Sequence, residues 1–242
     1  MARYNNFHKN TFVQKNVIKD DNFTYWFLLT ALNKFVRSRD KILDIGCGAG
    51  TIAFYFAKKG HQVLGIDISE RAIKADNKSA EIMVLKDVKF KVVNFPTKSP
   101  EEKFDFVIIT EVIEHLKRDT LAIQKIYNLL NLNGRLLLST PSKSAPLIKI
   151  GYAKEFDKKV GHLRRYSEDQ LVTLLVENNF KILEIKKVEG VLRNFLFING
   201  VAGNFVRILN RSSILSAIFT KIDNISIRLL GNSNFVVVAE KK

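Results

Sequence analysis

The chain has 242 residues, of which 46% are apolar. This suits one large domain, or one domain with an appendage, and excludes a wholly disordered chain. A single cysteine excludes a disulfide framework and a cysteine-based zinc site. With 39 Lys and Arg against 24 Asp and Glu, the formal charge is +15. Such a charge favours an anionic partner, either a nucleic acid or a membrane surface, unless it only reflects a lysine-rich composition.

The apolar runs are too short for a membrane-spanning helix, which needs about 20 predominantly apolar residues. The apolar stretch over residues 195–219 is interrupted by asparagine and arginine. Residues 1–21 contain no apolar core of a secretory signal. We therefore expect a cytoplasmic protein whose membrane contact, if any, is peripheral and on the inner face.

Hydrophobic periodicity predicts alternating strands and helices. In chain order they are a helix over 23–35, a strand over 41–45, a helix over 51–59, a strand over 61–67, a helix over 69–81, strands over 88–93 and 104–110, a helix over 119–130, a strand over 136–139, a helix over 167–178, and strands over 182–188 and 235–239. Asp119 is the expected N-cap of its helix, and Ser167 with Gln170 has capping-box spacing. Asn133-Gly134 is expected to end the helix before it.

This alternation is typical of an α/β fold with a parallel sheet covered by helices on both faces. The last two strands lack a regular helical crossover between them, so we expect an antiparallel pair at the sheet edge. The intervening segment is too long for a hairpin loop and is expected to be helical.

Three regions follow from this reading. They are an N-terminal helical cover over 1–40, a core over 41–190 and 233–242, and a helical insertion or lid over 191–232. The insertion is apolar and carries a net charge of +4, from five Arg and Lys against one Asp. It is expected either to admit a lipid-linked acceptor at a membrane surface or simply to complete the core.

A glycine-rich turn follows the first predicted strand. Gly46, Gly48 and Gly50 allow a tight turn and a close approach to a ligand, and the helix behind them presents unpaired N–H groups. Asp67, at the end of the second strand, can accept two hydrogen bonds from a ribose diol. Asp44 is poorly suited to a pyrophosphate but well suited to an ammonium or sulfonium group. The pattern predicts an adenosine ligand that carries a cation.

These segments resemble the class I S-adenosylmethionine-dependent methyltransferases. The resemblance rests on Leu43-Asp-Ile-Gly-Cys-Gly-Ala-Gly50, Gly65-Ile-Asp-Ile-Ser69, Phe104-Asp-Phe-Val-Ile108 and Gly134-Arg-Leu-Leu-Leu-Ser-Thr-Pro141. It runs over about residues 23–190 and resumes at the last strand. It implies a Rossmann-like, seven-stranded, mostly parallel sheet with an antiparallel last strand.

The resemblance also implies a cofactor site for S-adenosylmethionine. The residues it assigns to that site are Asp44, Gly46, Cys47, Gly48, Gly50, Asp67, Ile68, Asn94, Phe95, Thr110 and Glu111. The glycine turn would hold the methionyl part, and Asp67 with Ile68 the ribose and adenine. Asn94 stands where many members of the family have an acid.

Two further segments are expected at the carboxyl ends of the strands, where ligands of such sheets bind. If a helix begins after the fourth strand, Glu111, Glu114 and His115 share one face. They would then act as general bases or bind a divalent cation, or else brace the helix start.

The second segment, Gly161-His-Leu-Arg-Arg-Tyr-Ser167, follows the fifth strand. It carries His162 and three candidate substrate-binding residues, Arg164, Arg165 and Tyr166. Arginine grips carboxylate or phosphate in a bidentate manner, so the group suits an anionic or hydroxylated substrate. The alternative is that it pins the loop to the next helix.

Together, Glu111, Glu114, His115 and His162 resemble two metal-using branches of the family. These are the ubiquinone-biosynthesis O-methyltransferases and the small-RNA 3′-terminal 2′-O-methyltransferases. The resemblance implies that the four residues bind Mg²⁺ or another divalent cation, with His115, His162 and Glu111 as catalytic residues. We expect in-line O-methylation of a small-molecule or lipid-linked acceptor, with RNA methylation as the alternative. A non-catalytic cofactor-binding scaffold is a third reading.

Overall fold

The computed structural model describes residues 13–199 and 202–242. Seven strands form one sheet in the order β3-β2-β1-β4-β5-β7-β6. They are β1 (Ile42–Ile45), β2 (Val63–Asp67), β3 (Val88–Val92), β4 (Phe104–Thr110), β5 (Leu130–Pro141), β6 (Phe180–Val188) and β7 (Asn234–Lys241). Neighbouring strands among β1 to β5 pair in parallel, whereas β7 runs antiparallel to both β5 and β6. The predicted Rossmann-like sheet with an antiparallel last strand is confirmed.

The sheet is covered on both faces because successive strand side chains point to opposite sides. One cluster of buried side chains joins Ile42 and Phe106 to α2 (Trp26–Phe35), α3 (Thr51–Lys58) and α4 (Glu70–Ile82). The other joins Leu43 and Val107 to α5 (Asp119–Leu129) and α8 (Glu168–Val176). All these strand residues are fully buried, as expected of a sheet with helices on each side.

Several local predictions differ from the structure. No regular helix starts at Glu111, which has a φ of 54° and is followed by the single 3₁₀ turn η2 (Ile113–His115). Asp119 is the first residue of α5 rather than its N-cap, which is Arg118. The loop expected after the fifth strand contains α6 (Pro146–Lys149) and α7 (Lys154–Val160).

Two other helix-end predictions had different outcomes. The helix α5 ends before Asn133-Gly134, which lie within β5 instead. The capping box of α8, formed by Ser167 and Gln170, is confirmed.

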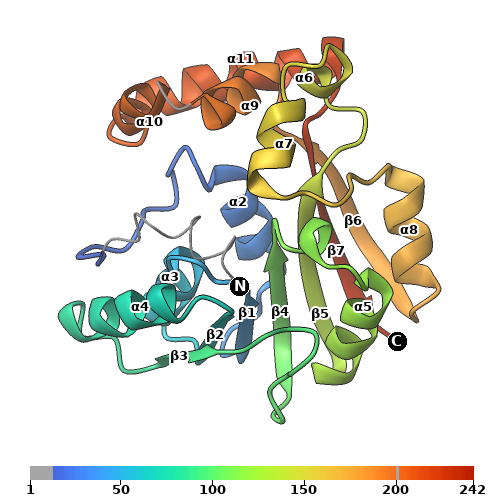
Figure 1. The fold of residues 1–242 in the computed structure, drawn as a ribbon. Helices are drawn as coiled ribbons and strands as arrows, with labels where there is room; N and C mark the ends of the chain where they lie inside the picture. Colours follow the sequence, from blue (N-terminus) through green and yellow to red (C-terminus); the bar gives the residue numbers. More distant parts are fainter. Residues whose placement is uncertain (1–12, 200–201) are drawn as a thin grey trace.

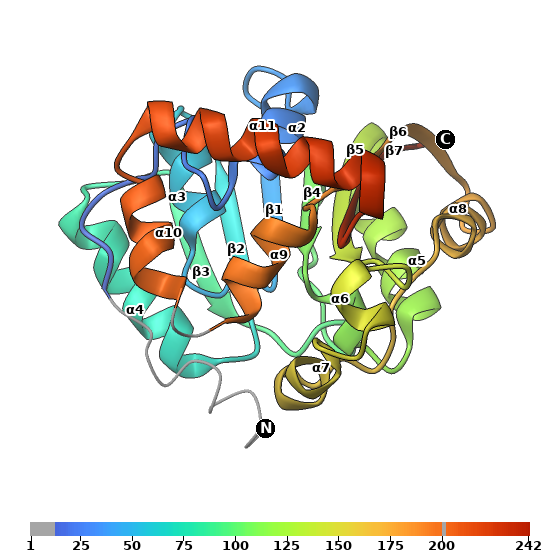
Figure 2. The ribbon, with the colours of Figure 1, turned by 90° about the horizontal axis from the view of Figure 1, so that it is seen from above.

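The segment between β6 and β7 is helical, as its length predicts. It forms α9 (Val191–Ile198), α10 (Gly203–Leu209) and α11 (Ser213–Leu230), which lie beyond the carboxyl ends of the parallel strands (Figures 1 and 2). Within the described ranges, none of the helices has the length and hydropathy to span a bilayer. Residues 1–12 of the expected N-terminal cover lie outside the described part of the chain.

Candidate active site

A cavity of about 1150 Å³ lies at the carboxyl ends of the parallel strands. Its lining runs from the turn after β1, past the ends of β2, β3 and β4, to α7 and α9. In a parallel sheet, such a crevice opens where the connections after two adjacent strands run to opposite faces of the sheet. One half is therefore built from the glycine turn and the other from segments distant in sequence.

The glycine turn requires residues without a side chain. Gly46, Gly48 and Gly50 all have positive φ angles, of 71°, 56° and 66°. A Cβ on Gly46 would lie 2.3 Å from a methyl group of Val112, and one on Gly50 would lie 2.8 Å from the ring of Phe54. Gly46, Cys47 and Gly48 line the cavity, whereas Gly50 shapes the turn without being part of the lining.

Asp67 connects the glycine turn to the next helix. Its Oδ2 accepts a hydrogen bond from the backbone N–H of Gly48 at 3.0 Å, and its Oδ1 accepts one from Ser69 at 2.8 Å. Ser69 in turn caps α4 through its side chain. The carboxylate is thus held at the cavity wall in one orientation, as a ribose-binding acid needs to be.

Two further buried carboxyl groups surround this turn. Burial, together with nearby Asp67, raises the pKa of Asp44 to about 7. Burial also raises the pKa of Asp76 to about 8, with Asp67 and Asp44 adding to the rise. Asp44 lines the cavity. Such a concentration of buried carboxyl groups, which a nearby cation would help to ionise, favours a cationic ligand over a pyrophosphate.

The other residues assigned to the cofactor lie in the same half. Ile68, Asn94, Phe95, Thr110 and Glu111 all line the cavity. Tyr25, the residue before α2, also lines it and belongs to the region expected to form an N-terminal helical cover.

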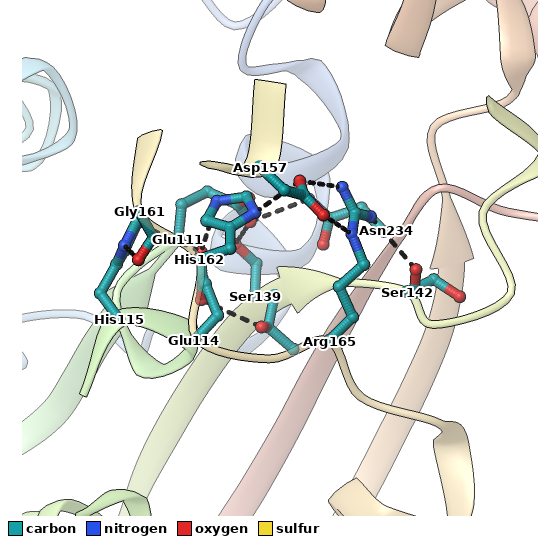
Figure 3. A network of polar contacts seen from close by, with 11 residues as sticks. Glu111, Glu114, His115, Ser139, Ser142, Asp157, Gly161, His162, Arg165 and Asn234 are labelled. Atoms are coloured by element: carbon teal, nitrogen blue, oxygen red, sulfur yellow. Dashed lines mark hydrogen bonds and ion pairs between the residues drawn. The ribbon is translucent and has the colours of Figure 1, made fainter. Parts of the chain in front are cut away.

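The half of the cavity away from the glycine turn contains a buried carboxyl group facing two imidazoles (Figure 3). Glu114 is fully buried, and its Oε2 accepts a hydrogen bond from Thr140 at 3.0 Å. Its Oε1 has no hydrogen-bond partner within the described residues. That oxygen lies 3.9 Å from Nε2 of His115 and 3.8 Å from Nε2 of His162. Burial, with Glu111 nearby, raises the pKa of Glu114 well above its usual range.

Both imidazoles are oriented through their other nitrogen. Nδ1 of His115 lies 3.2 Å from the carbonyl oxygen of Gly161, which can only accept, so this nitrogen donates. Nδ1 of His162 lies 2.9 Å from Oδ1 of Asp157. Nε2 is therefore the basic nitrogen of each neutral ring. Burial lowers the pKa of His115, which favours its neutral form.

Asp157 also anchors Arg165. The guanidinium donates to both carboxylate oxygens at 2.7 and 2.6 Å. Although burial opposes it, hydrogen bonds from Arg165 and His162 lower the pKa of Asp157 to about 2. Arg165 lines the cavity, as predicted for a substrate-binding residue, but its charge is already paired.

The structure places the other two proposed substrate-binding residues outside the cavity lining. Arg164 pairs with Asp119, and the hydroxyl of Tyr166 donates to the same carboxylate at 2.8 Å. Both therefore tie the loop to the first turn of α5, which matches the structural alternative for this segment.

Glu111 lies near Glu114, but its carboxylate is engaged by other residues. Its Oε1 accepts hydrogen bonds from Ser139 at 2.7 Å and from Asn234 at 2.8 Å. The group with metal-ligand spacing is Glu114, His115 and His162, whose ligand atoms all lie within 4.8 Å of one another. Of the four residues expected from the sequence, Glu111 is not in this group, because the backbone at Glu111 turns away from a helical path.

A polar floor that sequence reasoning missed lies beside Glu111. It contains Glu189, Ser233 and Asn234, which line the cavity. Burial, with Glu111 nearby, raises the pKa of Glu189 to about 8. The Ser233 Oγ and the Asn234 Oδ1 are buried without a partner in the described residues. The predicted antiparallel last strand was the available signal, since its start must return to the carboxyl ends of the parallel strands.

Comparison with known proteins gives the family. A family model described as a methyltransferase domain matches residues 37–190. The chain is 29% identical over 133 residues to the ubiquinone biosynthesis O-methyltransferase of Pelagibacter ubique, covering 55% of this chain and 52% of that protein. It is 30% identical over 160 residues to the mitochondrial enzyme of the same description from Schizosaccharomyces pombe, covering 62% and 58%. The match thus spans little more than half the length of these relatives.

Solved structures share the fold. Magnesium protoporphyrin IX methyltransferase from Synechocystis PCC 6803 has a TM-score of 0.63 at 17% identity, over 100% of this chain and 94% of that chain. Phosphoethanolamine N-methyltransferase 2 of Haemonchus contortus has a TM-score of 0.65 at 20% identity, over 100% and 56%. The chain belongs to the methyltransferase-domain family, and residues 37–190 form a class I S-adenosylmethionine-dependent methyltransferase domain.

Proposed function

We propose that this enzyme methylates a hydroxyl group of a small-molecule or lipid-linked acceptor. The observation that carries the proposal is the buried Oε1 of Glu114, which has no hydrogen-bond partner among the described residues. It faces the basic nitrogens of His115 and His162 in the half of the cavity away from the glycine turn, which we call the acceptor half. A hydroxyl must lose its proton as it is methylated, and this cluster offers groups that can take it. The ubiquinone-biosynthesis relatives are O-methyltransferases by name, which supports the same acceptor atom.

In this proposal, residues in one half of the cavity bind the cofactor and residues in the other half deprotonate the acceptor. When bound, S-adenosylmethionine supplies a methyl group on a positively charged sulfur, which an acceptor oxygen can displace in line. Asp67 would hold the ribose, and Asp44 would face the cationic end of the cofactor. His115 or His162 would accept the hydroxyl proton at Nε2. Positioning supplies most of the acceleration, with about 7–11 kcal/mol available from proximity alone.

As the alternative to proton transfer to a histidine, we propose that a divalent cation such as Mg²⁺ is held by Glu114, His115 and His162, whose Nε2 atoms would then be ligands and not proton acceptors. The support is chemical: a buried carboxylate oxygen without a partner and two oriented imidazoles lie within mutual reach of one ion. The cation would lower the pKa of a hydroxyl bound to it. Titration calorimetry with Mg²⁺ and Mn²⁺, with and without cofactor, tests this. Absence of binding, with full activity in a chelator, would remove the metal from the proposal.

A lipid-linked acceptor is supported by the apolar wall that α9 contributes to the cavity. Phe197 and Ile198 line the same cavity as the polar floor, and Asn194 lies on the same helix. We infer that residues 191–232 act as a cover for this half, beside a core over 41–190 and 233–242. An acceptor with a polar head and an apolar tail would use both surfaces.

Terminal 2′-O-methylation of RNA is the second candidate. It is supported by the Glu114–His115 pair followed by His162, which resembles the small-RNA methyltransferases, and by the charge of +15. The discriminating experiment is transfer of a labelled methyl group into a whole-cell extract that is then separated into lipid, RNA and soluble fractions. Label in the lipid or soluble fraction supports the first proposal, and label confined to RNA supports the second.

The same assay tests the residue roles. Glu114→Gln and His162→Ala should lower turnover by about 100-fold or more with little change in cofactor affinity. Asp67→Ala should weaken cofactor binding instead. Glu101→Gln, at an exposed position in the loop before β4, is the matched control. Wild-type turnover in both acceptor-side variants would show that the cluster does not take the proton.

A further inference from the structure

The helix α11 is amphipathic, but its polar side faces the protein and its apolar side faces outward, which is the reverse of an ordinary surface helix. Its inward face carries Ser216, Thr220 and Asp223, all buried. Its outward face carries Ile214, Ile218, Ile222, Ile225 and Leu229, which are 74%, 52%, 47%, 50% and 77% exposed. We name these five residues the outer stripe. Their spacing of three or four residues places them along one side of the helix.

The inward polar face has a structural cause. Asp223 accepts hydrogen bonds from the backbone N–H groups of Gly190 and Arg193, both at 2.9 Å, and so satisfies the start of α9. Thr220 accepts from the Arg193 guanidinium at 2.9 Å. The orientation of α11 is therefore fixed by buried hydrogen bonds, and rolling its apolar side inward would break them.

The exposed apolar surface extends beyond α11. Phe205 and Ile208 of α10 are 42% and 52% exposed. Ile150 and Tyr152, between α6 and α7, are 76% and 51% exposed. The ring of Tyr152 lies 5.7 Å from that of Phe195 in α9, which links this loop to the insertion. Figures 1 and 2 show α9–α11 and α6 together at the end of the molecule where the parallel strands terminate.

The exposed charges of the insertion itself are of one sign. The segment 190–232 contains a single acid, Asp223, which is buried and faces inward. Its exposed charges are Arg207, Arg211, Lys221 and Arg228. Within the part of the chain that the structure describes, none of these four cations forms an ion pair. An apolar stripe flanked by unpaired cations is the composition that binds an interface with anionic lipid headgroups.

We propose that the outer stripe, with its flanking cations, docks the enzyme on an anionic membrane surface. A second copy of the chain fits the same surface less well, because a two-fold contact would bring Lys221 and Arg228 of both copies together. Since α11 packs against α9, which lines the cavity, docking would place the acceptor half next to the bilayer. Docking of this kind rests on the proposed function, because it would give a lipid-linked acceptor a route from the bilayer to the cavity.

The test is sedimentation of the full chain with vesicles, measured without any acceptor. Vesicles of phosphatidylcholine mixed with phosphatidylglycerol should carry the protein down, and vesicles of phosphatidylcholine alone should not. Added salt should weaken the binding. The double variant Ile218→Asn, Ile222→Asn should lose at least about tenfold in binding. The double variant Lys221→Gln, Arg228→Gln, which keeps the stripe, should lose roughly 30-fold.

Two controls keep the outcome interpretable. Leu132→Asn changes a residue that is 75% exposed at the other end of the sheet and should bind vesicles as the wild type does. Cofactor binding should be unchanged in every variant, which separates a failure of docking from a failure of the methyltransferase. Equal binding to both vesicle types, or wild-type binding by the stripe variant, would overturn the proposal. So would a stable dimer in light scattering that the stripe variant dissociates.

Discussion

Replacing Asp44 by Asn should weaken cofactor binding while stabilising the cofactor-free protein at alkaline pH. Asp44 is 2% exposed in the wall of the cofactor half. Burial and nearby Asp67 raise its pKa from 3.8 to about 7. The amide of asparagine has the same shape but carries no charge, so the substitution isolates the effect of the buried carboxylate.

The effect on stability follows from the direction of the pKa shift. The unfolded chain loses this proton near about pH 4, whereas the folded protein holds it to about pH 7. The folded state therefore binds more protons over that window, and the free energy of unfolding falls as the pH rises through it. A rise to about 7 amounts to about 4 kcal/mol, at about 1.4 kcal/mol for each pKa unit. At about pH 8, Asp44→Asn should recover up to that amount.

The effect on binding has the opposite sign. Removing one member of a close, buried charge pair costs about 2–5 kcal/mol, which is roughly 30-fold or more in affinity. Between about pH 8 and about pH 6 the wild type should lose about tenfold in affinity, because only the ionised fraction of Asp44 attracts the cation. The variant should lack this contribution, so the two proteins should become more alike at the lower pH.

Titration calorimetry with S-adenosylmethionine at both pH values, and urea unfolding of the free proteins, measure these effects. Asp87→Asn, at an exposed carboxylate in the turn before β3, is the control and should change neither quantity. The reasoning would be refuted by a variant that binds the cofactor at about pH 8 as tightly as the wild type. It would equally fail if the variant were less stable than the wild type at that pH.

Two further predictions concern stability. Gly65→Ala should lower the free energy of unfolding by about 1–3 kcal/mol, because its Cβ would lie 2.6 Å from the buried ring of Phe90. The control Gly203→Ala, with nothing within 4 Å of the added carbon, should be neutral in the same urea titration, and an unchanged midpoint for Gly65→Ala would contradict the packing. Arg193→Met should cost about 3 kcal/mol, since it breaks a buried pair but leaves Asp223 with two backbone donors. A loss below about 1 kcal/mol would show that Arg193 does not hold α9 and α11 together.

The cofactor half could be predicted from the sequence because its parts are local. Gly46 to Gly50 follow the strand that ends at Ile45, and Asp67 ends the next parallel strand beside it. Adjacent parallel strands bring their carboxyl ends together in any twisted sheet, so the turn and the acid had to meet. The structure adds that Asp67 also holds the turn itself, through the N–H of Gly48.

The acceptor half depended on contacts between distant segments. Glu114, Thr140 and His162 meet only because β4, β5 and the loop after α7 end at one place. The backbone turn at Glu111 took its carboxylate to Asn234, which a helical register could not indicate. The floor around Glu189 likewise required β6 and β7 to return to the cavity.

The sequence by itself determined the α/β fold and the alternation of its strands with the covering helices, and it indicated a cationic adenosine ligand, because each follows from periodicity or from neighbouring residues. The charge of +15 excluded little until the burial of each side chain was known. Only the tertiary structure decided that α11 turns its apolar side outward, since Asp223 and Thr220 are used inward to hold α9. Amphipathic spacing shows that a helix has two faces, and only packing determines which of them meets water.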